Sequence, residues 1–472
     1  MKKINKLFIL YIIILTTLTG CYDYREINTL AIVSATEINK IGDEYQVSVQ
    51  AINPQAPDKT IDPQAPFIIY TGTGKTIQEA YRSITLSASR FMYSNHLDLL
   101  IINEKIAKEN ISDLIDYYTR NPGIRTEFYV LISKDDNILS VTTPIDEISS
   151  ASIKESIEND YKYYGVSSRT TFSEFVNMNL NPNLEIVLPT IELVKDTSTK
   201  DKNIDEEKNN NEDVNANKDK DNNDNNKDKD NNENNDKNKS NNSEDKNNKS
   251  NQEENESDGT SNKNTEKTEV KDKYLLGGYA IFKNNKLVGY LNNKESINYN
   301  ILTNNIKNTI ITYECSKNKY LAVEITNSSS SIKTKNNKVS IDINLKGNIN
   351  ESHCDIDITK NKNIKKISHD IEQKLNKEIT DDILNVRNNY HTDIYKFKDT
   401  IYKHDYSYYQ KIKNNYDEVY QNLDISVKTN IHLIGKGNIL EVINEKDKYL
   451  RNNVFNNHYK YFYLFLYQYY SS

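Results

Sequence analysis

The sequence is poor in the residues from which catalytic and metal sites are usually built. It has no tryptophan, three cysteines and seven histidines in 472 residues. No two histidines have the H-E-x-x-H spacing of a zinc site, and no G-x-S-x-G nucleophile element occurs. Carboxylates are plentiful, but no pair of them is set apart by its position. The sequence therefore predicts no enzyme, no bound metal and no cofactor.

An excess of basic charge is also missing. The chain carries 61 Lys and Arg against 68 Asp and Glu, a net charge of −7. Residues 200–273 hold 15 Lys against 22 Asp and Glu, which is again −7, so the rest of the chain is neutral. No basic face for a nucleic acid is implied, and we expect no nucleic acid among the partners.

Apolar residues form only a short continuous run, near the start of the chain. Three lysines among the first six residues precede the apolar residues 7–15, which is the pattern of an export signal and too short for a confident membrane span. The residues LTGC at 18–21 fit a bacterial lipobox, whose cysteine receives a diacylglycerol. We expect 1–20 to be a lipoprotein signal peptide and Cys21 to be lipidated. Fatty acids such as palmitate would then hold the mature chain at a membrane, outside the cytoplasm.

Two stretches have only part of a ligand-binding loop. The segment TGTGKT at 71–76 ends like a phosphate loop, but that pattern needs a glycine where Ile69 stands. We expect a turn there, with Thr76 capping the next helix and Glu79 three residues on. An acidic stretch further along alternates like a calcium loop, but Asp224 occupies the position of the required glycine.

From residue 196 to 273 apolar residues nearly disappear and no hydrophobic period remains. Such a segment cannot bury enough apolar surface to offset the entropy of ordering it. We expect a disordered linker, rich in Asn, Asp, Lys and Glu, between two folded parts at 21–195 and 274–436. The tail at 437–472 ends in an aromatic stretch and stays unassigned.

In the first folded part, β-rich runs alternate with segments of helical spacing. The runs TLAIVSATEI and EYQVSVQAI are joined by NKIGD, which is a hairpin signal. Ile77, Tyr81 and Ile84 then recur at helical spacing, and Phe128 shares one strand face with Val130. We expect a mixed sheet with helices packed on it, followed by a small second unit from about residue 144.

After the linker the pattern changes to longer strands and one long helix. A hairpin is predicted across Asn284, and the apolar residues from Val339 to Leu345 alternate with polar ones as in a half-buried strand. Apolar residues then recur at steps of three or four from Ile364 to Ile401, which predicts one helix of roughly 40 residues lying along a sheet. The predicted fold class is α+β, with two or three mixed sheet-and-helix domains separated by the linker.

Two cysteines remain in the second folded part. Cys315 and Cys354 both stand at the ends of predicted strands. Outside the cytoplasm a disulfide between them is permitted, and it is geometrically plausible. Two free buried thiols are the alternative that the sequence leaves open.

Several stretches together resemble the Ger(x)C family of spore-germination lipoproteins. GCYDYREINTLAIVSATEI is similar to the start of the family's mature chains, and the stretch from GKTIQEAYRS to FYVLISKD is similar to its N-terminal domain. GGYAIFKNNKLVGYL and the stretch from DIYKFKDT to NIHLIGKG resemble the start and the close of its C-terminal domain. The residues that match the family's short elements are Arg90, Tyr93, His96 and Leu97, and then Asn121, Pro122, Ile124 and Arg125.

The resemblance covers most of 21–195 and 274–437, and it implies the C subunit of a nutrient germinant receptor. Such a subunit is needed for spore germination and is not a known enzyme. It is a lipoprotein on the outer face of the spore inner membrane, where it works with integral membrane A and B subunits. Three features depart from the family: Tyr22 and Tyr416 stand where tryptophan is frequent, the linker is unusually long, and the tail after about Gly437 has no counterpart.

Other functions stay open at this point. A solute-binding lipoprotein of an importer would need two similar lobes, whereas the halves of this chain are unlike. A structural lipoprotein of the spore envelope is a further alternative. Arg90 and His96 are candidate ligand-binding residues, although a helix–strand junction commonly recruits such side chains for capping and hydrogen bonding.

Overall fold

The structure is a computed structural model. It describes residue 26 and residues 29–52, 67–121, 123–141, 149–194 and 273–435. The expected signal peptide, the lipidation site at Cys21, the linker up to residue 272 and the tail at 437–472 lie outside the described residues. The described part consists of helices packed on two β-sheets, so the α+β prediction is confirmed.

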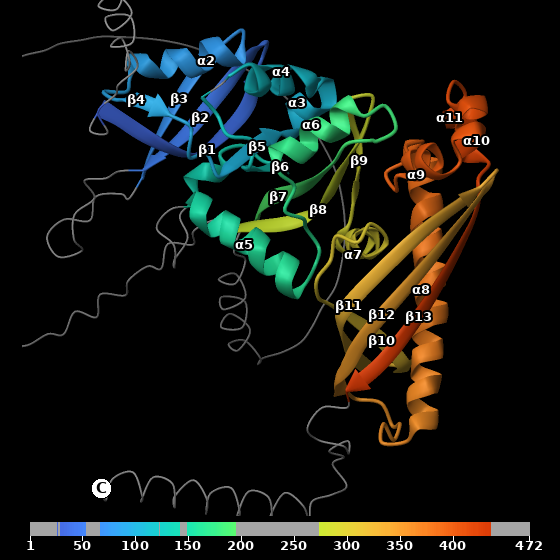
Figure 1. Ribbon diagram of the computed structural model, residues 1–472. Helices are drawn as coiled ribbons and strands as arrows, with labels where there is room; N and C mark the ends of the chain where they lie inside the picture. Colours follow the sequence, from blue (N-terminus) through green and yellow to red (C-terminus); the bar gives the residue numbers. More distant parts are fainter. Residues whose placement is uncertain are drawn as a thin grey trace, which may run out of the picture. The chain divides into compact units, whose positions relative to one another are not determined.

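The first sheet has nine strands (Figure 1). Their order is β3-β2-β1-β5-β6-β7-β8-β9, and β4 pairs separately with β1. The pairs β1–β5, β5–β6 and β6–β7 are parallel, and antiparallel strands flank this centre on both sides. The strands are β1 (Leu30–Ile41), β2 (Glu44–Ile52), β3 (Phe67–Gly74), β4 (Phe91–Tyr93), β5 (Leu99–Asn103), β6 (Tyr129–Ser133), β7 (Val187–Val194), β8 (Lys273–Lys283) and β9 (Lys286–Leu291).

Helices cover both faces of this sheet (Figure 1). One face packs against α2 (Ile77–Ser83), α3 (Glu104–Glu109), α4 (Ser112–Arg120) and α6 (Phe172–Leu180), and α5 (Ser149–Tyr163) packs against the other. Strand β5 is therefore buried on both faces, which explains its uninterrupted apolar run. The residues expected as a small second unit from about 144 form α5, α6 and β7 of this same sheet-and-helix assembly.

The hairpin of β8 and β9 completes the nine-stranded sheet from beyond the linker. Strand β8 pairs antiparallel with β7 over Val187↔Ile281 to Val194↔Lys273. The predicted turn is confirmed, since Asn284 and Asn285 connect β8 to β9 with φ angles of 50° and 64°. Two successive positive φ angles are typical of the tight hairpin turn whose twist matches that of the strands. The sheet thus contains residues from both sides of the linker.

The second sheet has four strands in the order β10-β11-β12-β13. Strands β12 and β13 are parallel, and the crossover between them contains α8 and the three shorter helices that follow it. The predicted alternation along β12 is confirmed, because its apolar residues are buried in the core that α8 shares with this sheet. The elements of this part are α7 (Asn293–Leu302), β10 (Thr309–Ser316), β11 (Lys319–Lys335), β12 (Lys338–Ser352), α8 (Asn361–Tyr390), α9 (Phe397–His404), α10 (Tyr406–Ile412), α11 (Tyr416–Gln421) and β13 (Asp424–Gly435).

The extent predicted for the long helix is wrong. The helix expected from Ile364 to Ile401 ends at Tyr390, and a second helix, α9, begins at Phe397. Between them His391 adopts a left-handed conformation with φ of 51°, which closes α8. The buried stripe of α8 consists of Ile367, Ile371, Leu375, Ile379, Ile383 and Val386.

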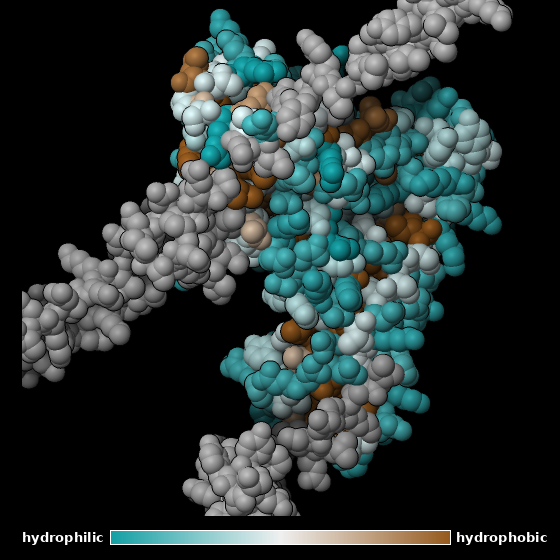
Figure 2. All heavy atoms as spheres, turned by 60° about the vertical axis from the view of Figure 1, so that its left-hand side comes forward, coloured by the Kyte–Doolittle hydropathy of each residue, from teal (hydrophilic) through white to brown (hydrophobic). Residues whose placement is uncertain are grey.

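The apolar residues of the described chain gather mainly in three buried clusters. The face drawn in Figure 2 is mostly hydrophilic, and its hydrophobic residues form small separate patches. Isolated apolar residues of this kind are normal on protein surfaces. Within the described ranges, no helix is both long enough and apolar enough to cross a membrane.

Candidate functional site

A cavity of about 690 Å³ lies beside the nine-stranded sheet, at the start of β1. Its walls come from four elements that are distant in sequence: β1, α2, the segment around β4, and the end of α4 with the turn after it. A volume of this size is typical of small-molecule sites. The lining residues are Leu30, Ile32, Gln78, Tyr81, Arg82, Thr85, Phe91, Met92, Tyr93, Ser94, Asn95, His96, Tyr117, Asn121, Gly123 and Ile124.

Local sequence features place α2 against the sheet as one wall. Thr76 accepts a hydrogen bond from the Glu79 backbone at 3.1 Å, which confirms the predicted cap. Gly72 in β3 allows α2 to approach closely, because a Cβ there would lie 2.3 Å from the Ala80 carbonyl oxygen. Tyr81, the residue after Ala80, forms a hydrogen bond with Ser94 and so joins α2 to the segment after β4.

Three tyrosines contribute aromatic surface to the cavity, and each hydroxyl already has a side-chain partner. Tyr81 bonds to Ser94, the Tyr93 hydroxyl accepts from the Asn95 amide at 2.9 Å, and the Tyr117 hydroxyl bonds to Asn121. Burial raises the pKa of Tyr81 to about 12, and burial also raises the pKa of Tyr117. Both side chains are therefore neutral phenols at any ordinary pH.

The structure brings the two short family elements together on this cavity. Tyr93 and His96 from the first element line it, with their rings 5.9 Å apart, and Asn121 and Ile124 from the second element line it as well. Of the remaining matched residues, Leu97 is buried, Arg90 and Arg125 are outside the lining, and Pro122 lies outside the described residues.

Sequence reasoning missed most of the cavity wall, including Tyr81 and Arg82 of α2. Tyr81 was expected only as part of the apolar stripe of its helix, and Arg82, the next residue, was not singled out at all. The signal that could have found them is the helical spacing itself, because Gln78, Tyr81, Arg82 and Thr85 lie three or four residues apart on one side of α2 and η2 (Ile84–Leu86).

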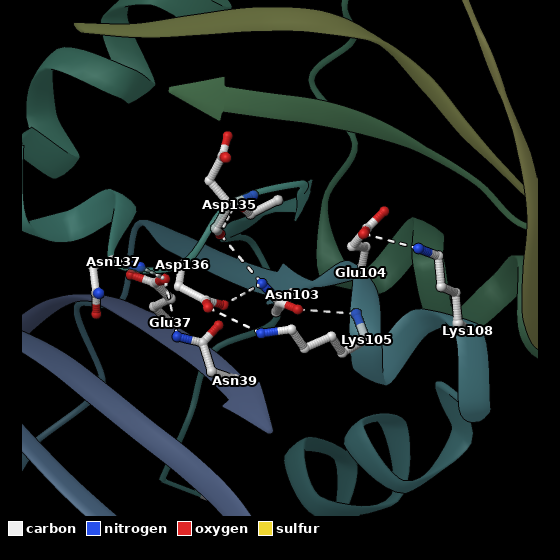
Figure 3. Close-up of polar contacts among 10 residues, drawn as sticks. Glu37, Asn39, Asn103, Glu104, Lys105, Lys108, Asp135, Asp136 and Asn137 are labelled. Atoms are coloured by element: carbon white, nitrogen blue, oxygen red, sulfur yellow. Dashed lines mark hydrogen bonds and ion pairs between the residues drawn. The ribbon is translucent and has the colours of Figure 1, made fainter. Parts of the chain in front are cut away.

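A second polar cluster lies where the central parallel strands end, and Figure 3 shows that its groups bond to one another. Glu37 is 1% exposed and accepts hydrogen bonds from the backbone of Asn137 at 2.7 Å and of Leu139 at 3.2 Å, and from the Asn39 amide at 3.2 Å. Burial raises the pKa of Glu37, and these hydrogen bonds oppose the rise. Glu37 therefore holds the 135–139 loop on β1, and its own carboxylate is not free for chemistry.

A third cluster joins the nine-stranded sheet to the helices after α8. Lys398 donates to the Pro182 carbonyl oxygen at 2.8 Å, and Tyr409 donates to the Asn183 side chain at 2.8 Å. Lys283 of β8 forms an ion pair with Asp417 at 3.0 Å. Glu185 lies within electrostatic reach of Lys283, Lys398 and Asp417, and also of the buried carboxylate of Asp393.

Glu185 should make the stability of the protein depend on pH. Burial, aided by the nearby Asp393 and Asp417 carboxylates and opposed by Lys283 and Lys398, raises its pKa from 4.5 to about 7. Between these values the folded chain keeps a proton that the unfolded chain has released, so stability should fall as the pH rises through this window. In Glu185→Gln this fall should shrink by about 3 kcal/mol, as measured by urea unfolding at several pH values.

The exposed carboxylate variant Glu44→Gln is the matched control and should keep the fall. An unchanged pH dependence in Glu185→Gln would contradict the raised pKa.

Cys315 and Cys354 form a disulfide in the structure, with their Cα atoms 6.1 Å apart. Cys315 belongs to β10, and Cys354 is buried just after β12. The bond links residues 39 positions apart and so restricts the unfolded chain. The described residues contain no group of three or more His, Cys, Asp or Glu side chains that could hold a metal ion.

Comparison with known proteins covers both folded parts. Residues 23–193 match the family described as "Spore germination protein N-terminal domain". Residues 277–437 match the family described as "Spore germination B3/ GerAC like, C-terminal". The two matches follow each other in the order that the sequence resemblance predicted.

Two curated proteins and one solved structure are similar to this chain. Spore germination protein KC of Bacillus subtilis (strain 168) is 24% identical over 444 residues, which are 90% of this chain and 94% of that protein. Putative spore germination protein YfkR of the same organism is 29% identical over 163 residues, which are 33% of this chain and 42% of that protein. A solved structure described as "Crystal Structure of the GerBC protein" has a TM-score of 0.44 at 14% identity, covering 84% of this chain and 96% of that one.

The two family matches together span more than half of the chain, and they are specific to spore germination. The predicted resemblance is therefore confirmed, and with it a role in spore germination. This chain belongs to the Ger(x)C family of spore germination proteins.

Proposed function

We propose that this protein is the C subunit of a nutrient germinant receptor, lipid-anchored at Cys21 on the outer face of the spore inner membrane. It acts there by assembly with integral membrane A and B subunits. The observation that carries this proposal is the similarity to spore germination protein KC over 90% of the chain, with both family domains in order. The lipobox at 18–21 supports the anchor.

Action by protein contact fits the polar clusters of the structure better than catalysis does. The buried carboxylate of Glu37 holds a loop, and that of Asp393 begins a helix, so hydrogen bonds within the protein already occupy both. A catalytic acid or base needs a position within reach of a substrate. We therefore propose a receptor subunit and not an enzyme.

The alternative of a solute-binding lipoprotein is less well supported. Such a protein would hold its solute between two similar lobes, whereas this chain has a nine-stranded mixed sheet and a four-stranded sheet with one long helix. A structural lipoprotein of the spore envelope would share the anchor but not the partners. Recovery of partner subunits therefore distinguishes the proposed receptor subunit from both alternatives.

The deciding experiment is an affinity purification of the tagged chain from detergent-solubilised spore inner membrane. We expect the A and B subunits in the eluate, in amounts comparable with the tagged chain, whereas an unrelated lipoprotein with the same tag should recover neither. Recovery of the chain without A and B would refute the assembly.

The anchor can be tested by Cys21→Ala. Without the thiol no diacylglycerol can be attached, so the protein should move from the membrane fraction to the soluble fraction, and germination should be weaker. Fractionation of spores and mass spectrometry of the N-terminal peptide measure the change. The double variant Cys315→Ala/Cys354→Ala keeps Cys21 and is the control that should stay at the membrane. Retention of the Cys21→Ala chain at the membrane would contradict lipidation as the anchor.

A further inference from the structure

The cavity beside α2 is lined by an arginine and, among the described lining residues, by no acidic side chain. The arginine is Arg82, and His96 belongs to the same lining. Outside residues 200–273, by comparison, the chain has equal numbers of basic and acidic side chains. A pocket that holds an arginine and no carboxylate among its described lining residues has a positive potential, which favours an anionic ligand.

Arg82 is available to a ligand. Its guanidinium forms no hydrogen bond or ion pair with any residue in the part of the chain that the structure describes. By contrast, Arg120 of the same domain pairs with Asp116 at 2.7 Å, and Arg169 pairs with Glu158 at 3.5 Å. A planar guanidinium without a partner matches a carboxylate, because it can donate two parallel hydrogen bonds to the two oxygens.

The rest of the lining suits an apolar body attached to that anion. The hydroxyls of Tyr81, Tyr93 and Tyr117 are already bonded to neighbouring side chains, which leaves their rings for contact with a ligand. Ile32 and Ile124 add aliphatic surface to the same lining. Aromatic and aliphatic walls together with placed polar side chains, here Gln78, Asn95 and Asn121 among others, are usual in a pocket for a small organic molecule.

We propose that this cavity binds a small organic carboxylate with an apolar body. The carboxylate pairs with Arg82, and the body lies against the tyrosine rings. A ligand that also carries an ammonium group fits less well, because no carboxylate of the described lining could pair with that second charge. The proposal concerns binding by this chain alone, so it does not depend on the proposed function.

The test uses the purified full mature chain and three probes in isothermal titration calorimetry. The probes are 4-phenylbutyrate, the neutral 4-phenylbutanol, and phenylalanine, which adds an ammonium group to a similar carboxylate. We expect 4-phenylbutyrate to bind at least about tenfold more tightly than either of the others. No binding of 4-phenylbutyrate at about 10 mM, or equal binding of the alcohol, would overturn the proposal.

A pair of arginine variants assigns the site. Arg82→Gln should weaken 4-phenylbutyrate binding by about tenfold to a hundredfold, since a hydrogen-bonded charge pair is lost. Arg120→Gln removes the same charge from an exposed position outside the cavity and should bind as the wild type does. Thermal unfolding of both variants shows that they are folded. Equal losses in the two variants, or no loss in Arg82→Gln, would show that the carboxylate does not bind at Arg82.

Discussion

Replacing Leu375 by alanine should lower the free energy of unfolding by about 2–5 kcal/mol. Leu375 is 3% exposed, in the middle of the buried stripe of α8, and belongs to the core that this helix shares with the four-stranded sheet. Truncation removes buried methyl groups and leaves a cavity that the neighbouring side chains fill only in part. Urea unfolding of the purified mature chain, followed by circular dichroism, measures the loss.

Lys377→Ala is the matched control, because Lys377 is exposed on the same helix and alanine is a good helix former. Its effect should stay within about 0.5 kcal/mol. In spores, Leu375→Ala should reduce the amount of folded subunit and slow germination, while Lys377→Ala should not. A loss below about 1 kcal/mol for Leu375→Ala would contradict its place in the core.

The spacing of apolar residues along the sequence predicted both β12 and α8. The alternation from Val339 to Leu345 identified β12, and the steps from Ile367 to Val386 identified α8. These patterns succeed because each element buries one face against the same core, so burial follows the repeat of the backbone.

The spacing of apolar residues could not predict where α8 ends. Ile394, Phe397 and Ile401 lie beyond the break, yet they are buried in the core that contains the α8 stripe, so the steps of three and four continue across it. Two local features end the helix. His391 adopts a left-handed conformation, and the side chain of Asp393 accepts a hydrogen bond from the backbone of Phe397. The usual start signal is a capping side chain directly before the helix, whereas the N-cap of α9 is Lys396, which makes no side-chain cap hydrogen bond.

The cavity was only partly predictable, for a different reason. The resemblance singled out Tyr93, His96 and Asn121 but gave no reason to connect them with Arg82 of α2. Their proximity depends on strand pairing, since β4 lies parallel to the start of β1 with Met92 opposite Ala31. Pairing between distant segments, like that of β8 with β7 across the linker, has no local sequence signal.

Asp393→Ala should destabilise the protein by about 3–4 kcal/mol, because several buried donors would lose their acceptor together. Asp393 is 6% exposed. One of its oxygens accepts from the backbone of Tyr395 and Phe397 at 3.2 Å each, and the other accepts from the Lys398 backbone at 2.8 Å and the Tyr416 hydroxyl at 2.6 Å. These bonds begin α9 and attach α11 to it.

Two further variants separate the contributions at this site. Tyr416→Phe removes a single hydrogen bond and should cost about 1 kcal/mol. Asp393→Asn keeps one acceptor oxygen but turns an amide NH₂ toward donors, so its cost should lie between the other two. Urea unfolding of the three variants measures how much free energy of unfolding each one loses, and so ranks them. If Asp393→Ala costs no more than Tyr416→Phe, the bonds to the α9 backbone contribute nothing, and the break between α8 and α9 must then be fixed by the burial of Ile394 and Tyr395 alone.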